Sequence, residues 1–178
     1  MTNLHTNLGT IVSEIKGVVS GVDAAAAERL LNEIAAAKRI FLAGCGRSGL
    51  MAKAFAMRLM HLGRTAFVVG ETTTPAIGAG DLLIVCSGKG AKETLASFMR
   101  EAAKAGARCA AVTARPESPV ARLAVVVVVV LPLKQTAQFG GSLFEQCLLV
   151  FFDGLVMQMI ESGSAAHSQM AARHANLE

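Results

Sequence analysis

The sequence predicts an α/β fold, a three-layer sandwich in which a five-stranded parallel sheet lies between helices. Five short segments are near-continuous apolar runs, and the six valines from Val125 to Val130 are the extreme case. Such runs are typical of parallel strands that are buried on both faces. Segments with helical spacing separate them, and right-handed crossovers then place helices on both faces of the sheet.

The elements are expected in the following order along the chain. Two segments rich in alanine and isoleucine precede the first strand and predict helices over 4–19 and 23–38. The expected strands are 39–43, 65–69, 82–86, 108–113 and 124–131. The helices expected between and after them are 48–62, 92–105 and 142–160. The first of these three shows the pattern, because Leu50, Met51, Ala54 and Phe55 fall on one broad apolar stripe.

Length and composition indicate a single domain over 1–178, with N-terminal helices over 1–38, an α/β core over 39–161 and a C-terminal helix and tail over 162–178. The chain has 178 residues, 53% of them hydrophobic and 17% charged, which excludes a disordered protein. Its longest strongly apolar run, 123–133, contains a proline and is shorter than the about 20 residues of a membrane span. We find no secretory signal and expect a cytoplasmic protein without a membrane partner.

The formal charge of +4 suits a small anionic ligand as well as nucleic acid. The chain has no Tyr or Trp and no basic block, so a nucleic-acid partner is not expected. None of the four cysteines, at positions 45, 86, 109 and 147, forms a C-x-x-C pair. We expect reduced core thiols rather than metal ligands or disulfides.

Two glycine-rich loops each follow an expected strand and open an expected helix, GCGRSG at 44–49 and SGKGAK at 87–92. Loops of this kind attract anions through free N–H groups, and a phosphate ester on a small metabolite is the expected ligand. The candidate phosphate-binding residues are Gly46, Arg47, Ser48, Ser87, Gly88, Lys89, Gly90 and Lys92. Solvated turns remain an alternative. The first loop also reads G-x-G-x-x-G, and with Glu71 after the second strand it leaves a dinucleotide site open.

Three residues are candidates for acid–base chemistry. Glu145 lies at the start of the long apolar helix, where burying a carboxylate costs free energy, so a role as a general base is one interpretation. With Ser142 it also fits a helix capping box, which is the other. His61 lies one turn after Arg58 and could line a pocket or end a helix half-buried. His174 lies in the final residues, which in many chains are frayed.

The motifs together resemble the sugar isomerase (SIS) domain family and, within it, the 6-phospho-3-hexuloisomerases. The segments that carry the resemblance are GCGRSG, AFAMRLMHLG and VVGETTTP between residues 39 and 81, then GGSLFEQ and the terminal RHANLE. It implies interconversion of D-arabino-3-hexulose 6-phosphate and fructose 6-phosphate, in the ribulose monophosphate route of formaldehyde assimilation. It also implies a flavodoxin-like or Rossmann-like sheet, no metal or organic cofactor, and a homotetramer whose sites are completed by neighbouring subunits.

The resemblance also implies roles for individual residues. The loop from Ser87 to Lys92 would grip the phosphate with help from the first loop, Glu145 would be the enediol base, and the tail with His174 would close over the substrate. Two places depart from the family pattern. Lys89, Ala91 and Lys92 stand where Ser, Glu and Thr are usual, and Ala76 where relatives tend to carry arginine. Three alternatives remain. The protein is another isomerase of the SIS family, a non-catalytic module that senses a sugar phosphate, or a nucleotide-binding protein.

Overall fold

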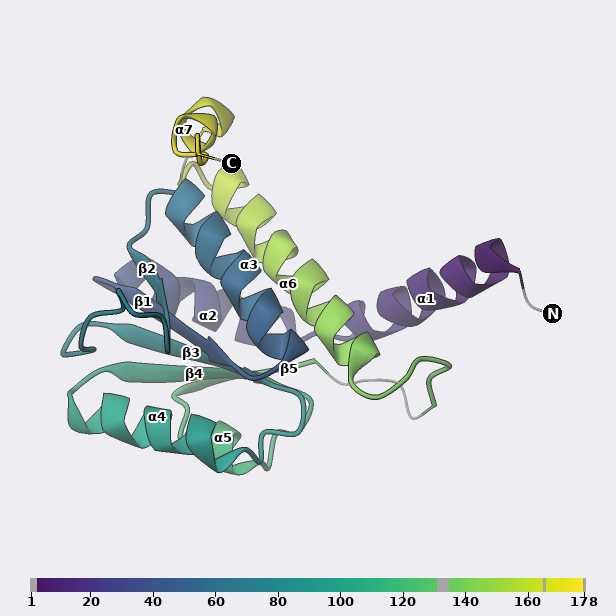
Figure 1. Ribbon diagram of the computed structural model, residues 1–178, viewed down its shortest axis with the longest axis horizontal. Helices are drawn as coiled ribbons and strands as arrows, with labels where there is room; N and C mark the ends of the chain where they lie inside the picture. The colour runs from purple at the N-terminus through teal and green to yellow at the C-terminus, as the bar shows by residue number, and fades with distance from the viewer. Residues whose placement is uncertain (1–2, 131–134, 165, 178) are drawn as a thin grey trace.

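The computed structural model describes residues 3–130, 135–164 and 166–177 and contains the expected parallel sheet (Figure 1). Its five strands are β1 (Ile40–Gly44), β2 (Ala66–Val68), β3 (Leu82–Ser87), β4 (Arg108–Thr113) and β5 (Val126–Val129). All neighbouring strands pair in parallel in the order β2-β1-β3-β4-β5. This is the flavodoxin-like order of a doubly wound sheet, so the predicted fold class is confirmed.

Helices connect and flank the strands. They are α1 (Leu4–Val19), α2 (Ala24–Ala36), α3 (Arg47–His61), α4 (Glu93–Lys104), α5 (Pro119–Arg122), α6 (Ser142–Glu161) and α7 (His167–Ala172). The long helices begin and end within two residues of their predicted bounds. The short α5 was not predicted. The last strand is shorter than the valine run, because pairing with β4 ends at Val129; position 131 of the predicted strand lies outside the described residues.

Residues along each inner strand alternate between two buried clusters. In β1, Ile40 and Leu42 pack with α2, α3 and α6, whereas Phe41 and Ala43 pack with α4 and α5. Figure 1 shows α3 and α6 side by side on one face of the sheet, and α4 and α5 on the other. Burial on both faces explains why the strands are continuously apolar.

The long helix α6 is a core helix of this fold. By length and composition it could cross a membrane, and half of its most apolar window is buried inside the molecule. Phe152 stacks on Phe55 of α3, with ring centroids 4.1 Å apart and planes 2° from parallel. Packing on the sheet therefore accounts for its hydropathy.

The carboxyl ends of β1 and β3 lie side by side, with Gly44 in register with Cys86. The chain crosses to β2 on one side of β1 and to β3 on the other, so the strand order reverses between β1 and β3. In doubly wound sheets this switch point is where ligands bind. Both glycine-rich loops begin there.

Candidate active site

A cavity of about 770 Å³ opens at this edge of the sheet. Its volume lies within the range of small-molecule sites. It is lined by Cys45, Ser48, Cys86, Ser87, Gly88, Lys89, Ala91, Lys92, Ala114, Arg115, Thr136, Gly140, Gly141, Leu143, Phe144 and Glu145. The loops after β1, β3 and β4 and the start of α6 therefore share one site.

The first glycine-rich loop turns sharply from β1 into α3. A Cβ at Gly49 would lie 2.7 Å from the carbonyl oxygen of Gly44, so no side chain fits there. Gly46 caps α3 without a side-chain hydrogen bond. The buried Ser48 lines the cavity, and Arg47 turns toward α6.

The second loop is closed by its own hydrogen bond, which Gly90 N–H donates to Ser87 Oγ at 3.1 Å. Gly90 has a φ of +61°, and a Cβ there would lie 2.1 Å from Ser118 Oγ. Ser87, Gly88, Lys89 and Lys92 line the cavity, whereas Gly90 packs beneath it. A side chain at position 90 is thus excluded by both backbone angle and space.

The three helices that begin at the cavity lack side-chain caps. No side chain bonds to the first turn of α3, α4 or α6, whereas Asn3, Asp23 and Ser118 cap α1, α2 and α5. Uncapped first turns leave N–H groups and the positive end of the helix dipole available. The cavity therefore favours an anionic ligand.

Glu145 and Arg47 form an ion pair at the cavity, through Glu145 Oε2 and Arg47 Nε. The Glu145 side chain is 14% exposed and that of Arg47 60%. The capping box with Ser142 is absent, because the helix is capped at Gly141 without a side-chain bond. That interpretation of Glu145 was wrong, and its carboxylate is held by an arginine at the cavity wall.

The structure places His61 and His174 away from this cavity. His61 ends α3, and its buried ring stacks on that of His174 with centroids 5.2 Å apart. Arg173 Nη1 donates to the carbonyl of His61 at 3.0 Å, so the C-terminal segment docks on this helix end. Because Arg47 begins the same helix, the histidines lie about 20 Å along its axis from the ion pair. One chain therefore does not bring Glu145 and the histidines together.

Two features of the site were missed in the sequence. Arg115 follows β4 at the same edge and lines the cavity beside Lys89, which its position after a strand could have indicated. Glu14 of α1 accepts hydrogen bonds from Thr136 Oγ1, Ala137 N–H and Gln138 Nε2 at 2.8 to 2.9 Å. These bonds, that of Ala137 first, hold the pKa of Glu14 below its usual value. Nothing in the sequence signals this contact.

Other sequence candidates have structural partners. Glu71, the potential ribose-binding acid, pairs with Lys53 at 3.1 Å on the surface. All four cysteines are free; burial raises the pKa of Cys86 to about 12 and those of Cys109 and Cys147 to about 11. Within the described ranges, no three His, Cys, Asp or Glu side chains are grouped as metal ligands.

Comparison with known proteins supports the resemblance. The family model described as the SIS domain matches residues 33–140. A 3-hexulose-6-phosphate isomerase of Mycobacterium gastri is 40% identical over 183 residues, covering 99% of this chain and 92% of the relative. One of Bacillus subtilis is 39% identical, covering 94% and 95%. A Methanococcus jannaschii crystal structure, from which that same function was inferred, has a TM-score of 0.88 and 30% identity, covering 97% and 99%.

Proposed function

The chain belongs to the SIS domain family, and from this membership we propose that it is an isomerase that interconverts D-arabino-3-hexulose 6-phosphate and fructose 6-phosphate. The observation that carries the proposal is one cavity with the Glu145 carboxylate on one wall and the lysine-bearing loop after β3 on another. The names of the relatives supply the substrate pair. The activity belongs to ribulose monophosphate chemistry in the cytoplasm.

In the proposed mechanism, Glu145 acts as a single base that moves a proton between neighbouring carbons. Its carboxylate takes the proton from C2 of the 3-ketose, leaving a 2,3-enediol, and returns it to C3. The proton of the C2 hydroxyl moves to the oxygen at C3, so the carbonyl ends at C2. A carboxylate at the cavity wall, oriented by Arg47, is suited to this transfer.

The phosphate anchors the sugar so that its reacting carbons meet the base. Ser48, Ser87 and Lys89 are the proposed anchors, with Lys92 at the start of α4. Arg47 is reassigned from phosphate binding to positioning Glu145, because its guanidinium is bound to that carboxylate. Anchoring a remote group uses binding energy to orient the reacting atoms.

We propose a homotetramer in which His61 and His174 act in the site of a neighbouring copy. The support is twofold. Within one chain, the histidines lie at the end of α3 that is far from Glu145. The outer faces of α3 and α6 also expose Leu50, Met57, Val150 and Met157, of which Met157 is 62% exposed. Apolar side chains on two adjacent helices favour association between copies.

Incubation with fructose 6-phosphate in D₂O tests the reaction. By NMR we expect deuterium at C3 of the recovered fructose 6-phosphate, and a 3-ketose product that carries deuterium at C2 and its ketone at C3. Both should form at least about 10²-fold more slowly with the Glu145→Gln variant. Deuterium at C1, together with the formation of an aldose phosphate, would indicate a different sugar-phosphate isomerase. Binding of the sugar phosphate without any label would indicate a sensing module and contradict the proposed activity.

A further inference from the structure

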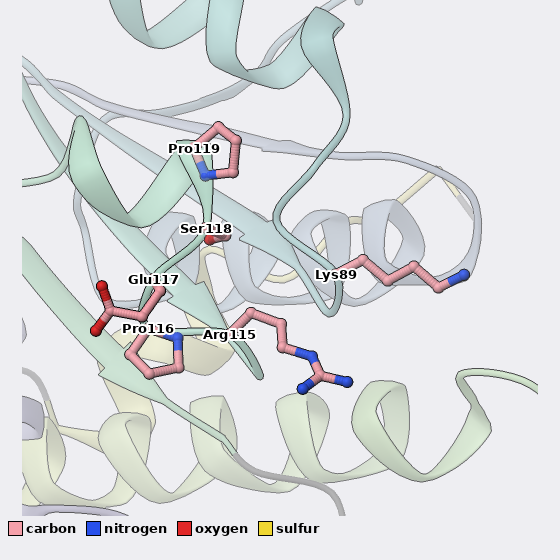
Figure 2. Close-up of a pocket in the computed structure, with 6 residues that line it drawn as sticks. All are labelled: Lys89, Arg115, Pro116, Glu117, Ser118 and Pro119. Carbon is pink, nitrogen blue, oxygen red and sulfur yellow. The ribbon is translucent and has the colours of Figure 1, made fainter.

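Two cationic side chains line both the main cavity and a neighbouring one. The second cavity, of about 540 Å³, lies between the loops after β3 and β4 (Figure 2). Lys89 and Arg115 are the two residues that line both cavities. Figure 2 shows their side chains extending in the same direction from their two loops, while the carboxylate of Glu117 points away from them.

Backbone hydrogen bonds join the two loops that carry these cations. The carbonyl of Gly88 accepts from Ala114 N–H at 3.2 Å and from Thr113 Oγ1 at 3.4 Å. Val120 N–H donates to the carbonyl of Gly90 at 3.2 Å. The backbone N–H of Arg115 is itself held by Thr113 Oγ1 at 3.1 Å.

The charges of Lys89 and Arg115 are not balanced by carboxylates. Among the ion pairs of the described residues, none includes either side chain, whereas Arg39, Arg47 and Arg108 each pair with an acid. A guanidinium can bind two oxygens of a phosphate at once, and an ammonium adds a point charge. Together they complement a dianion better than a single cation does.

We propose that Arg115, with Lys89, holds the phosphate group of the substrate at the junction of the two cavities and sets the preference for a phosphorylated sugar. This inference rests on the proposed function and adds to it a residue from the loop after β4. The phosphate then lies at the loop after β3, with Ser48 on the side of β1 and Arg115 on the side of β4, and the sugar extends through the main cavity toward Glu145.

The Arg115→Gln variant tests the subsite. We expect its KM for fructose 6-phosphate to rise about tenfold or more, with kcat within about twofold, because a charge-assisted bond made equally in ground and transition states is lost. The inhibition constant of inorganic phosphate, measured as a competitive inhibitor, should rise by a similar factor. Arg115→Lys should recover part of the affinity. Arg122→Gln, an exposed arginine on α5 outside both cavities, is the matched control and should leave both constants unchanged.

Calorimetric titration with fructose 6-phosphate separates this inference from the proposed reaction. If the wild type binds without turnover and Arg115→Gln loses binding, the reaction is wrong and the subsite stands. If the wild type turns over and Arg115→Gln keeps its KM and its affinity for phosphate, the subsite is overturned. A loss of kcat alone, in a variant that melts like the wild type, also overturns it, because phosphate anchoring then does not involve Arg115.

Discussion

Glu145 is the residue on which the proposed chemistry depends. It lies at the start of an apolar helix, yet its carboxylate reaches the cavity and binds the guanidinium of Arg47. The arginine comes from the first turn of α3, so the packing of α6 on α3 creates the pair. An ion pair of this kind holds the carboxylate in one orientation without closing the cavity.

Replacing Glu145 by Gln removes the base and keeps the shape of the side chain. We expect kcat to fall by at least about 10²-fold, the lower range for a general base, with little change in KM. Steady-state kinetics measures both constants. Glu161→Gln changes an exposed acid at the other end of the same helix and is the control. Near-normal turnover in Glu145→Gln would remove this residue from the mechanism.

Asp81 stabilises the fold rather than the site. Its buried carboxylate accepts from Arg39 Nη2 at 2.5 Å and from Gly78 N–H at 2.8 Å. The hydrogen bonds from Arg39 are the main reason that the pKa of Asp81 lies below its ordinary value. A folded-state pKa below the unfolded one stabilises the protein above the unfolded value, and that stabilisation is lost as pH falls through the folded value.

We therefore expect Asp81→Asn to lower Tm by several degrees at pH 7, because the half-buried Arg39 then keeps its bond to the carbonyl of Ala76 but has no carboxylate to balance its charge. The difference from the wild type should begin to shrink as pH falls below the ordinary pKa of an aspartate, and disappear only below the lower folded-state pKa, where the wild-type carboxyl also becomes protonated. Thermal melts followed by circular dichroism at several pH values measure this. Glu101→Gln, an exposed acid on α4, is the control. An equal difference at every pH would contradict the charge argument.

At the scale of elements, the N-terminal helix supports a wall of the site. Glu14 of α1 bonds to three donors in 136–138, and the same loop brings Thr136, Gly140 and Gly141 to the cavity. The contact links segments more than a hundred residues apart. The loop before α6 is therefore positioned by a helix that does not itself line the cavity.

Glu14→Gln should reduce kcat/KM by roughly tenfold, because a neutral amide cannot accept from all three donors and small displacements near a site are costly. The depressed pKa of Glu14 adds a pH signature. In the wild type, the hydrogen bonds from residues 136–138 to Glu14 should persist to pH values below the ordinary pKa of a glutamate. The activity that depends on them should therefore be lost only in stronger acid. Kinetics across pH tests this. Ser13→Ala, exposed on the same helix, should behave like the wild type.

Most elements could be predicted because local pattern determines them. The strand over 108–113 was predicted residue for residue, since its apolar run is also its paired length. The four residues of α5 are too few to show a helical period. The glycine loops and Glu145 could be linked to one site because carboxyl ends of parallel strands share an edge. The Arg47–Glu145 pair and the hydrogen bonds between Glu14 and residues 136–138 could not be predicted, because both depend on how segments distant in the sequence pack together.

At the scale of the whole molecule, the two candidate histidines lie far from the proposed base. The docked C-terminal segment keeps His174 on His61 at the far end of α3. The proposed tetramer would place one copy's histidines at another copy's cavity. The exposed apolar faces of α3 and α6 are the surfaces expected to bury each other.

Mixing two impaired variants tests this arrangement. Glu145→Gln and His174→Ala should each have low activity, and subunit exchange between them should restore part of it, because some shared sites then contain both residues. Light scattering should give a mass near four times 18.5 kDa for each protein. A mixture no more active than its components, or a monomeric mass, would contradict sites shared between subunits.

The contact between Gly90 and Ser118 has an evolutionary consequence. A single added carbon at position 90 would collide with the serine and would also need a left-handed backbone angle, so glycine should be retained at this position. Positions 89, 91, 92 and 115 are exposed and under no such restriction. Natural divergence toward new ligands should accumulate at those four places, while the glycine beneath them is inherited unaltered.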